Sequence, residues 1–483
     1  MHKAASYRTI LRASSLMGAA SVLHILLGIV RIKIAAVLLG PAGVGLIGIL
    51  QNMMATATAV GTLGMDTVGT RKIASEPDPQ QQAQVARALF WGLLGFGLIV
   101  GTGFFVLRQP ISTALLGMPE SESQIGWIAV GILFAVASAA QIALLNGLRR
   151  IRSLALLKVL SAILATCLCI AALLSNSTLK IQLFIIAVPF ANLAVGHLLV
   201  WTIRRNLTGG RGVGVLPQIR KMAVQGAPLM LASLATILAQ LAVRSLVQVN
   251  LGSAALGHFE ASWMISMTYL GFVLGAMATD YFPRLSAAIA DPVAASRLVN
   301  EQTEVALILI GPVLIVLMAF APLVINLLYT AEFHEAAGIL RWQIFGDLLK
   351  IISWPLSFVL LALGLSRTYL CVEAVAAAVF VAVVASLLGS VGINSTGIGF
   401  LAIYLVYAPL VLVVAYKRIG FRWSAHVMLR AGALAAGLGT VFAVTESYPR
   451  AGMVAGGMLA VIFAIEGACT IRRTTAEHRK YPS

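Results

Sequence analysis

Long apolar runs alternate with short polar turns along the whole chain. A membrane-spanning helix needs about 20 predominantly apolar residues, and the runs reach that length repeatedly. Because they are continuous, and not stretches of ~10 residues with alternating polarity, they favour helices over a β-barrel. The pattern predicts fourteen helical segments: 13–38, 43–68, 84–107, 125–147, 154–174, 180–203, 221–248, 256–281, 303–329, 337–363, 368–389, 395–416, 425–444 and 451–471.

The distribution of basic residues predicts the orientation of these helices. Of the 34 lysines and arginines, 26 fall on the side of the N-terminus, four on the opposite side and four within helices. Cytoplasmic loops of membrane proteins are enriched in Lys and Arg. We therefore expect a multi-pass protein of the bacterial inner membrane with both termini in the cytoplasm. No cleavage pattern interrupts the first apolar run, so we expect an uncleaved first helix.

Composition excludes several classes of function. The chain has 483 residues, of which 60% are hydrophobic and only 11% charged, against about 25% charged in soluble domains. The net charge of +17 resides in short loops, so we expect no nucleic-acid partner. The four cysteines lie within apolar runs, and no nucleotide-binding, zinc-binding or serine-nucleophile motif occurs. No loop is long enough for a catalytic domain. We therefore expect no enzyme activity, metal or cofactor.

A short internal repeat indicates a duplication. The turn that starts at Leu39-Gly40 follows Arg31, and a second turn that starts at Leu251-Gly252 follows Arg244. In both turns another glycine comes five residues after the first. A parallel repeat of this kind predicts two six-helix lobes. We assign the N-terminal lobe to 1–210, the C-terminal lobe to 211–420, and two additional helices with a cytoplasmic tail to 421–483.

Polar side chains repeat at helical spacing in the corresponding helices of both halves. Residues three or four apart share one face of a helix, and a charge within a bilayer usually faces a bundle interior or a water-filled cavity. We therefore expect the first, second, seventh and eighth helices to line one chamber. The candidate substrate-binding residues are Arg31, Arg244, Gln240, Gln248, His24, Gln51, Lys33, Glu260 and Lys350.

Several of these charges have a plainer interpretation. Lys33 points away from the Arg31 stripe and can extend to the outer headgroups, and His24 can be a hydrogen-bonded interior residue. Asp347 and Lys350 can neutralise each other within one helix. The candidate gating or ion-coupling residues are Asp66, Asp280 and Asp347, of which Asp66 and Asp280 can pair with nearby arginines, Arg71 and Arg284. Arg31 and Arg244 are the strongest candidates, since arginine stays charged and both halves supply one.

The turn Leu39-Gly40-Pro41-Ala42-Gly43-Val44-Gly45, together with Arg31, Gln51 and the stretch Asp280-Tyr281-Phe282-Pro283-Arg284-Leu285-Ser286, resembles Wzx-type O-antigen and exopolysaccharide translocases. These belong to the multidrug/oligosaccharidyl-lipid/polysaccharide (MOP) exporter superfamily. The resemblance covers about residues 8–417. It implies an all-α polytopic membrane protein with the MATE-like fold of MOP flippases. Many relatives have twelve helices, so the two extra helices here are a departure.

The resemblance implies a flippase that moves an undecaprenyl-diphosphate-linked oligosaccharide from the cytoplasmic to the periplasmic leaflet by alternating access. The pathway would be assembly of O-antigen, an enterobacterial-common-antigen-like glycan or exopolysaccharide. Partners would be that glycan lipid, a coupling ion (H⁺ or Na⁺) and polymerase or chain-length proteins. Arginines suit a diphosphate, which they bind through charge-assisted hydrogen bonds. Two alternatives stay open, a cation-coupled multidrug (MATE-like) antiporter and a lipid II flippase.

Overall fold

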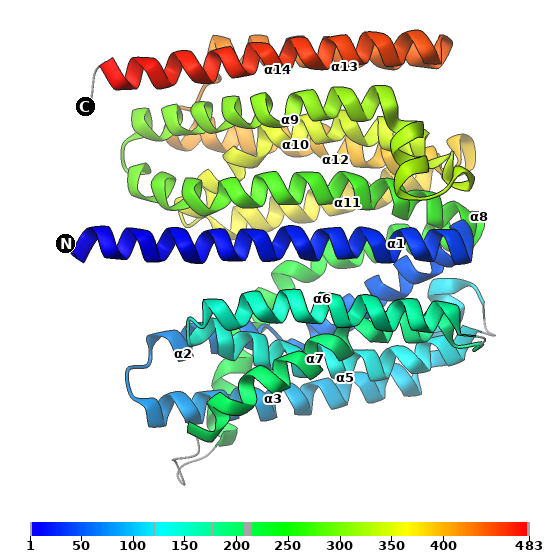
Figure 1. Cartoon of the computed structure of the whole chain (residues 1–483), viewed down its shortest axis with the longest axis vertical. Coiled ribbons are helices and arrows are strands. Elements are labelled where there is room, and N and C mark those ends of the chain that lie inside the picture. Colours follow the sequence, from blue (N-terminus) through cyan, green and yellow to red (C-terminus); the bar gives the residue numbers. More distant parts are fainter. Residues whose placement is uncertain (1, 119–120, 176, 207–214, 481–483) are drawn as a thin grey trace. The chain divides into compact units, whose positions relative to one another are not determined.

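The computed structural model describes residues 2–118, 121–175, 177–206 and 215–480, and these residues form an all-helical protein (Figure 1). The prediction of an all-α protein is confirmed. The helices are α1 (His2–Thr62), α2 (Met65–Ser75), α3 (Pro79–Val106), α4 (Arg108–Ile111), the π-helix η1 (Ser112–Leu116), α5 (Glu122–Gly147), α6 (Ile151–Leu174), α7 (Lys180–Asn206), α8 (Val215–Ala288), α9 (Pro292–Leu328), the 3-10 helix η3 (Ala331–Phe333), α10 (Ala336–Ala362), α11 (Ser366–Val391), α12 (Asn394–Ile419), α13 (Ala425–Ser447) and α14 (Pro449–Lys480).

Twelve helices in the described part of the chain are long and apolar enough to cross a membrane. Two of them, Leu16–Thr62 and Ser233–Ala288, have 47 and 56 residues. Since one crossing takes about 20 residues, each of these two has the length of two crossings. This agrees with the fourteen predicted segments and with a multi-pass membrane protein.

Both long helices are interrupted at a glycine of the predicted repeat. Gly40 has φ 63° and ψ −169°, and Gly252 has φ 84° and ψ 175°. This combination of angles is open essentially to glycine alone, because a Cβ atom would be strained there. The two glycines that the sequence repeat aligns therefore make the same kink, and each kink ends one crossing and starts the next.

The chain forms two compact units, Met1–Leu256 and Gly257–Ser483. The lobe boundary expected at 210–211 lies outside the described residues, and the division by packing falls later. The first part of α8 belongs to the first unit because small residues bring it close to α2. A Cβ atom on Gly226 would collide with the main chain of Leu63 and Gly64. In addition, Ser245 Oγ donates to the carbonyl oxygen of Leu115, 3.0 Å away.

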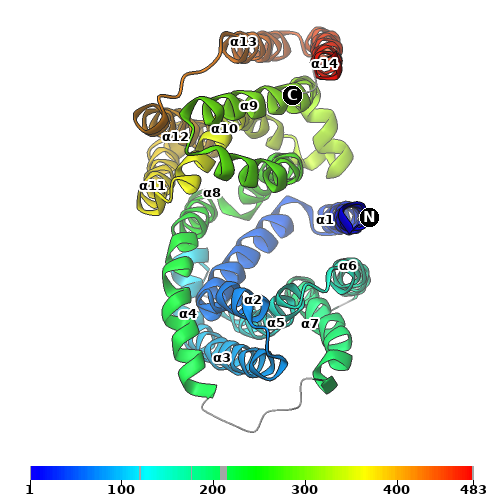
Figure 2. The same ribbon diagram turned by 90° about the vertical axis from the view of Figure 1, so that its left-hand side faces the viewer.

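In the first unit, α5 packs between α3 and α7, and α7 also packs on α6 (Figure 2). The first part of α1 runs beside α6 (Figure 1). Glycine makes these close contacts possible. For example, Gly97 of α3 faces Val136 of α5, where an added Cβ atom would lie 3.1 Å from a valine methyl carbon. The α1–α6 contact is the one that positions the candidate site described below.

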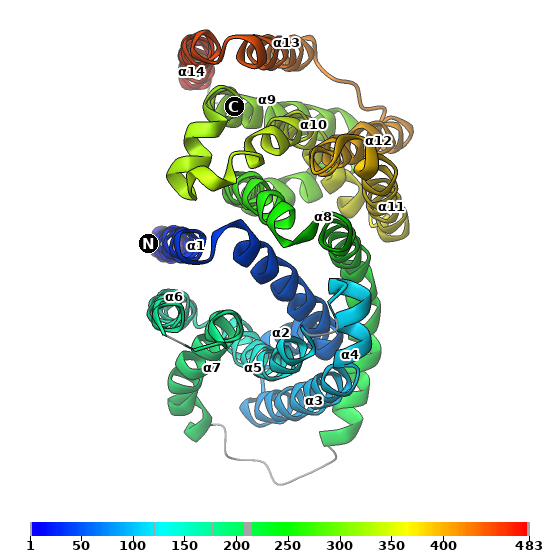
Figure 3. The ribbon, with the colours of Figure 1, turned by 90° about the vertical axis from the view of Figure 1, so that its right-hand side faces the viewer.

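In the second unit, α10 packs against α9 and α12, and α11 packs on α12 (Figure 3). The two additional helices, α13 and α14, pack on α9. Their contact includes an ionic cluster in which Arg430 of α13 donates to Glu304 of α9, at 2.8 Å, and to Glu466 of α14. The Arg430 side chain is only 11% exposed, so this ion-pair cluster is buried and links the additional helices to the rest of the unit.

Candidate functional site

A cationic stripe runs along the contact between α1 and α6 in the first unit. Lys158 of α6 donates from Nζ to Ser21 Oγ of α1, at 3.3 Å. His24, one turn further along α1, interacts electrostatically with both Lys158 and Arg31. Ser21 and Arg31 are ten positions apart, or about 15 Å along a helix that rises 1.5 Å per residue. The positive charges therefore follow the first crossing of α1, between its start near Leu16 and the kink at Gly40.

Arg31 carries an unsatisfied donor in this stripe. Its Nη1 atom is buried and has no hydrogen-bond acceptor among the described residues. No ion pair between described residues involves Arg31 or Lys158. A buried cationic donor without a partner is costly. The arrangement therefore favours an anion as ligand, and a phosphate group suits the planar guanidinium best.

The polar stripe predicted on α8 is also present in the first unit. Arg244 is 4% exposed, and its Nη1 atom donates to the carbonyl oxygen of Gln240 at 3.3 Å. Gln248 is 2% exposed and donates from Nε2 to Ser253 Oγ at 3.0 Å. The structure thus brings Arg31 and Arg244 into the same compact unit. The sequence interpretation had assigned them to different lobes.

A buried carboxylate forms a second centre, in the second unit. Asp347 of α10 is fully buried and accepts from Ser266 Oγ at 2.9 Å and from the Tyr269 hydroxyl, both on α8. Two hydroxyl donors compensate a buried charge better than apolar contacts can. Asp347 is therefore held between α8 and α10.

Lys350 lies one turn from Asp347 without the direct ion pair that the sequence suggested. No ion pair within 4 Å joins the two side chains, although they interact electrostatically. Lys350 Nζ instead lies 3.6 Å from Met267 Sδ, 5.7 Å from the centre of the Tyr404 ring and 5.9 Å from that of Phe400. Such contacts stabilise a cation less than a carboxylate does. The two charges therefore interact within the helix without forming a direct ion pair.

A second carboxylate balances Lys350 from α11. Glu373 interacts electrostatically with Lys350 and accepts a hydrogen bond from the Tyr407 hydroxyl at 3.0 Å. The lysine therefore interacts with two carboxylates and forms a direct ion pair with neither of them.

The remaining predicted residues occupy various environments. Gln51, Lys33 and Glu260 are half-buried, and Glu260 interacts electrostatically with Tyr329. Asp66 is half-buried in the first turn of α2. Asp280 is 72% exposed and accepts from Arg284 at 3.0 Å, which confirms their predicted pairing. An exposed pair of this kind contributes little energy, so the structure does not single out Asp280 as a coupling residue.

The sequence did not indicate several groups at these centres. From the sequence, Lys158 belongs to the basic residues of the cytoplasmic side. Its position within α6 was the only indication of a role in the site. Ser266, Tyr269 and Tyr407 carried no signal, since hydroxyl residues are common in membrane helices.

At the end of the first unit, burial together with nearby Lys221 and Arg71 lowers the pKa of Lys72 on α2. This crowding shows that the end of the unit is strongly basic.

Comparisons with known proteins agree with this architecture. The sequence profile described as polysaccharide biosynthesis protein matches residues 34–338. The lipid III flippases of Escherichia coli (strain K12) and Shigella flexneri are each 21% identical to the chain over 406 residues, which cover 83% of this chain and 96% of the relative.

Solved structures show the same fold at low sequence identity. The inward closed conformation of the lipid II flippase MurJ matches with a TM-score of 0.73 and 12% identity, over 93% of this chain and 98% of that one. An inward-facing multidrug resistance MATE transporter of the MOP superfamily matches with a TM-score of 0.63 and 18% identity, over 82% and 94%. The fold is thus that of MOP transporters. With its profile match over more than half of its length, the chain belongs to the polysaccharide biosynthesis protein family of membrane transporters.

Proposed function

We propose that this protein is a flippase that moves an undecaprenyl-diphosphate-linked oligosaccharide from the cytoplasmic to the periplasmic leaflet of the bacterial inner membrane. Both termini lie in the cytoplasm in this proposal. The glycan serves assembly of O-antigen, an enterobacterial-common-antigen-like polymer or exopolysaccharide. The similar lipid III flippases, matched over nearly their whole length, support a lipid-linked substrate. Polymerase and chain-length proteins are the expected partners.

The observation that carries the proposal is the unsatisfied Nη1 donor of Arg31 in a stripe with Lys158 and His24. A diphosphate brings two phosphate groups with several acceptor oxygens, which suits two cations on neighbouring helices. Arg244, with the amides of Gln240 and Gln248, supplies further donors in the same unit. In the proposed mechanism the diphosphate engages these groups while the prenyl chain stays in lipid.

The membrane potential favours outward movement of this substrate. The cell interior is negative, and each elementary charge is worth roughly 2.3 kcal/mol per 100 mV. A diphosphate with about two charges gains roughly 5 kcal/mol if it crosses uncompensated. Exchange for a proton or Na⁺ is an additional source of energy. We assign that coupling to Asp347 and Lys350, since Asp347 is fully buried and the two charges interact electrostatically.

The charges also separate this proposal from its alternatives. A cation-exporting multidrug antiporter needs an anionic binding region, whereas the α1–α6 stripe is cationic. A lipid II flippase shares the diphosphate chemistry, so the headgroup sugars decide between the two flippases.

A deletion strain tests the proposal. Loss of the protein is expected to abolish surface polysaccharide and to accumulate the lipid-linked unit in the inner leaflet. Wild-type protein is expected to restore export, and Arg31→Ala to restore less than a tenth of it. Arg150→Ala, which removes an exposed arginine of the first unit, is the matched control and should restore export fully. Drug sensitivity with normal polysaccharide would identify the antiporter instead. Arrested peptidoglycan synthesis would identify lipid II flipping.

A further inference from the structure

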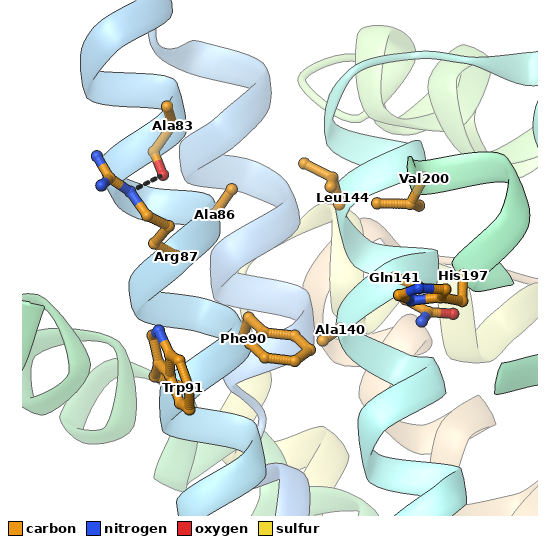
Figure 4. Close-up of a pocket in the computed structure, with 10 residues that line it drawn as sticks. All are labelled: Ala83, Ala86, Arg87, Phe90, Trp91, Ala140, Gln141, Leu144, His197 and Val200. Carbon is orange, nitrogen blue, oxygen red and sulfur yellow. Dashed lines mark hydrogen bonds between the residues drawn. The ribbon is translucent and has the colours of Figure 1, made fainter. Parts of the chain in front are cut away.

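A cavity of about 370 Å³ lies over α5 between α3 and α7 in the first unit, apart from the cationic stripe (Figure 4). Its volume falls within the range of small-molecule binding sites. Three helices of one compact unit form its walls, so it does not depend on the placement of the second unit. The lining residues are Ala83, Ala86, Arg87, Phe90, Trp91, Ala140, Gln141, Leu144, His197 and Val200.

Small side chains create the space. Ala83 and Ala86 of α3 face the cavity together with Ala140 of α5, where larger residues would fill it. Gly196 of α7 has a separate role, because a Cβ atom there would collide with the Oε1 atom of Gln141. The glycine therefore allows the amide of Gln141 to lie flat against α7.

Gln141 is an incompletely satisfied polar group in the cavity wall. The residue is only 6% exposed, and its Oε1 atom has no hydrogen-bond donor among the described residues. That atom is enclosed against α7, where Gly196 leaves room for it, so it does not face the cavity. His197 of α7 lines the same part of the cavity (Figure 4). The inner end of the cavity is therefore lined by the rest of the Gln141 side chain and by His197.

The other end of the cavity carries a cation and an aromatic surface. Arg87 lies on α3 with its Nε atom 3.4 Å from the carbonyl oxygen of Ala83 (Figure 4). Trp91, one turn further, is 57% exposed and packs edge-on against Phe90, with 5.6 Å between ring centres. A cation beside an exposed tryptophan is typical of the level where lipid headgroups meet acyl chains.

The depth of the cavity agrees with this chemistry. Arg87 follows the start of α3 by eight residues, and Gln141 precedes the end of α5 by six. At 1.5 Å per residue both lie about 9–12 Å from the same end of their helices. In the proposed orientation this is the cytoplasmic end, where the crowded basic residues Arg71, Lys72 and Lys221 also lie.

We propose that this cavity binds the headgroup of an anionic phospholipid of the cytoplasmic leaflet. Arg87 contacts the phosphate, the headgroup enters the cavity toward Gln141 and His197, and the acyl chains lie over Trp91 outside the cavity. The basic surroundings disfavour an amine headgroup. A lipid bound here contacts α3 and α5, and so stabilises the packing of the helices on which α1 lies.

Native mass spectrometry of the full-length protein tests the proposal, with phosphatidylglycerol, phosphatidate and phosphatidylethanolamine of identical chains as probes. Wild-type protein is expected to bind phosphatidylglycerol and phosphatidate more tightly than phosphatidylethanolamine. Arg87→Ala should weaken binding of both anionic lipids by about tenfold or more, since it removes a charge-assisted contact.

Arg150→Ala is the matched control, since it removes one exposed charge of the same unit outside the cavity, and less than a twofold change is expected. Arg87→Gln replaces Arg87→Ala if the alanine variant fails to fold. Equal losses in the Arg87 and Arg150 variants would overturn the proposal in favour of general electrostatic attraction. Equal binding of phosphatidylethanolamine would overturn it too, as would displacement of phosphatidylglycerol by undecaprenyl diphosphate at equimolar concentration. None of these results depends on transport, so the lipid-binding proposal and the proposed function can be refuted independently of each other.

Discussion

The kink at Gly252 yields a prediction in which two glycine-to-alanine changes in one helix have opposite signs. Gly252 has φ 84° and ψ 175°, and no atom lies within 4 Å of a Cβ atom built there. The substitution Gly252→Ala therefore meets no steric obstacle and gains no packing. Its whole effect is the backbone strain of an alanine in a conformation open to glycine, about 1–3 kcal/mol.

Gly271 provides the matched control in the same helix. It has no positive φ angle, and no atom lies within 4 Å of an added Cβ atom. Since glycine within a helix is about 0.5–1 kcal/mol less favourable than alanine, Gly271→Ala should stabilise the protein by that amount. The two variants should thus differ by about 1.5–4 kcal/mol, although each adds one methyl group to open space.

Unfolding of the purified protein in mixed micelles, with increasing SDS, measures both changes against wild type. The midpoint should move to lower SDS for Gly252→Ala and to higher SDS for Gly271→Ala. Gly40→Ala should behave like Gly252→Ala, because Gly40 has the same conformation. If Gly252→Ala is as stable as Gly271→Ala, the kink does not require glycine and the reasoning is refuted.

Three further changes test the packing and the buried charges. Gly226→Ala should destabilise the protein by ~3 kcal/mol, because the methyl group would collide with the main chain of Leu63 and Gly64 just before α2; a normal unfolding midpoint would contradict that close contact. Asp347→Ala should cost about 3 kcal/mol because it leaves Lys350 without its nearer carboxylate, and adding Lys350→Met should restore part of the loss in a double-mutant cycle; additive losses would show that the two charges are not coupled. Arg430→Ala should weaken the attachment of α13 and α14 by about 1–2 kcal/mol, measured as faster hydrogen exchange in those helices, since Glu304 and Glu466 would lose their common partner; unchanged exchange would mean that apolar packing alone holds them.

The transmembrane architecture could be predicted from the sequence because a bilayer demands apolar runs of a fixed length. The kinks could be located for a similar reason. Leu39-Gly40 and Leu251-Gly252 stand out as a repeated step in otherwise featureless apolar segments, and both glycines are now seen to have the special backbone angles. Arg31 and Asp347 could be singled out because charges are rare in such segments.

Groups that act through contacts distant in sequence could not be predicted. Lys158 joins the Arg31 stripe through a contact with Ser21, 137 positions away, and no pattern along the chain links them. The packing of the first part of α8 on α2 was missed as well, since main-chain contacts through Gly64 and Gly226 leave no hydrophobic signature. Asp347 and Lys350 were expected to pair at helical spacing, but hydroxyl groups of α8 hold the carboxylate instead.

The most direct test of the central claim is a flipping assay with the purified protein in proteoliposomes. An undecaprenyl-diphosphate-linked oligosaccharide with a labelled glycan is placed in one leaflet, and its arrival in the other is followed with a glycan-binding reagent that cannot cross the bilayer. The account predicts transfer by the wild type and by Arg150→Ala, and at least tenfold slower transfer by Arg31→Ala. Equal rates for all three proteins, or no transfer by the wild type, would contradict it.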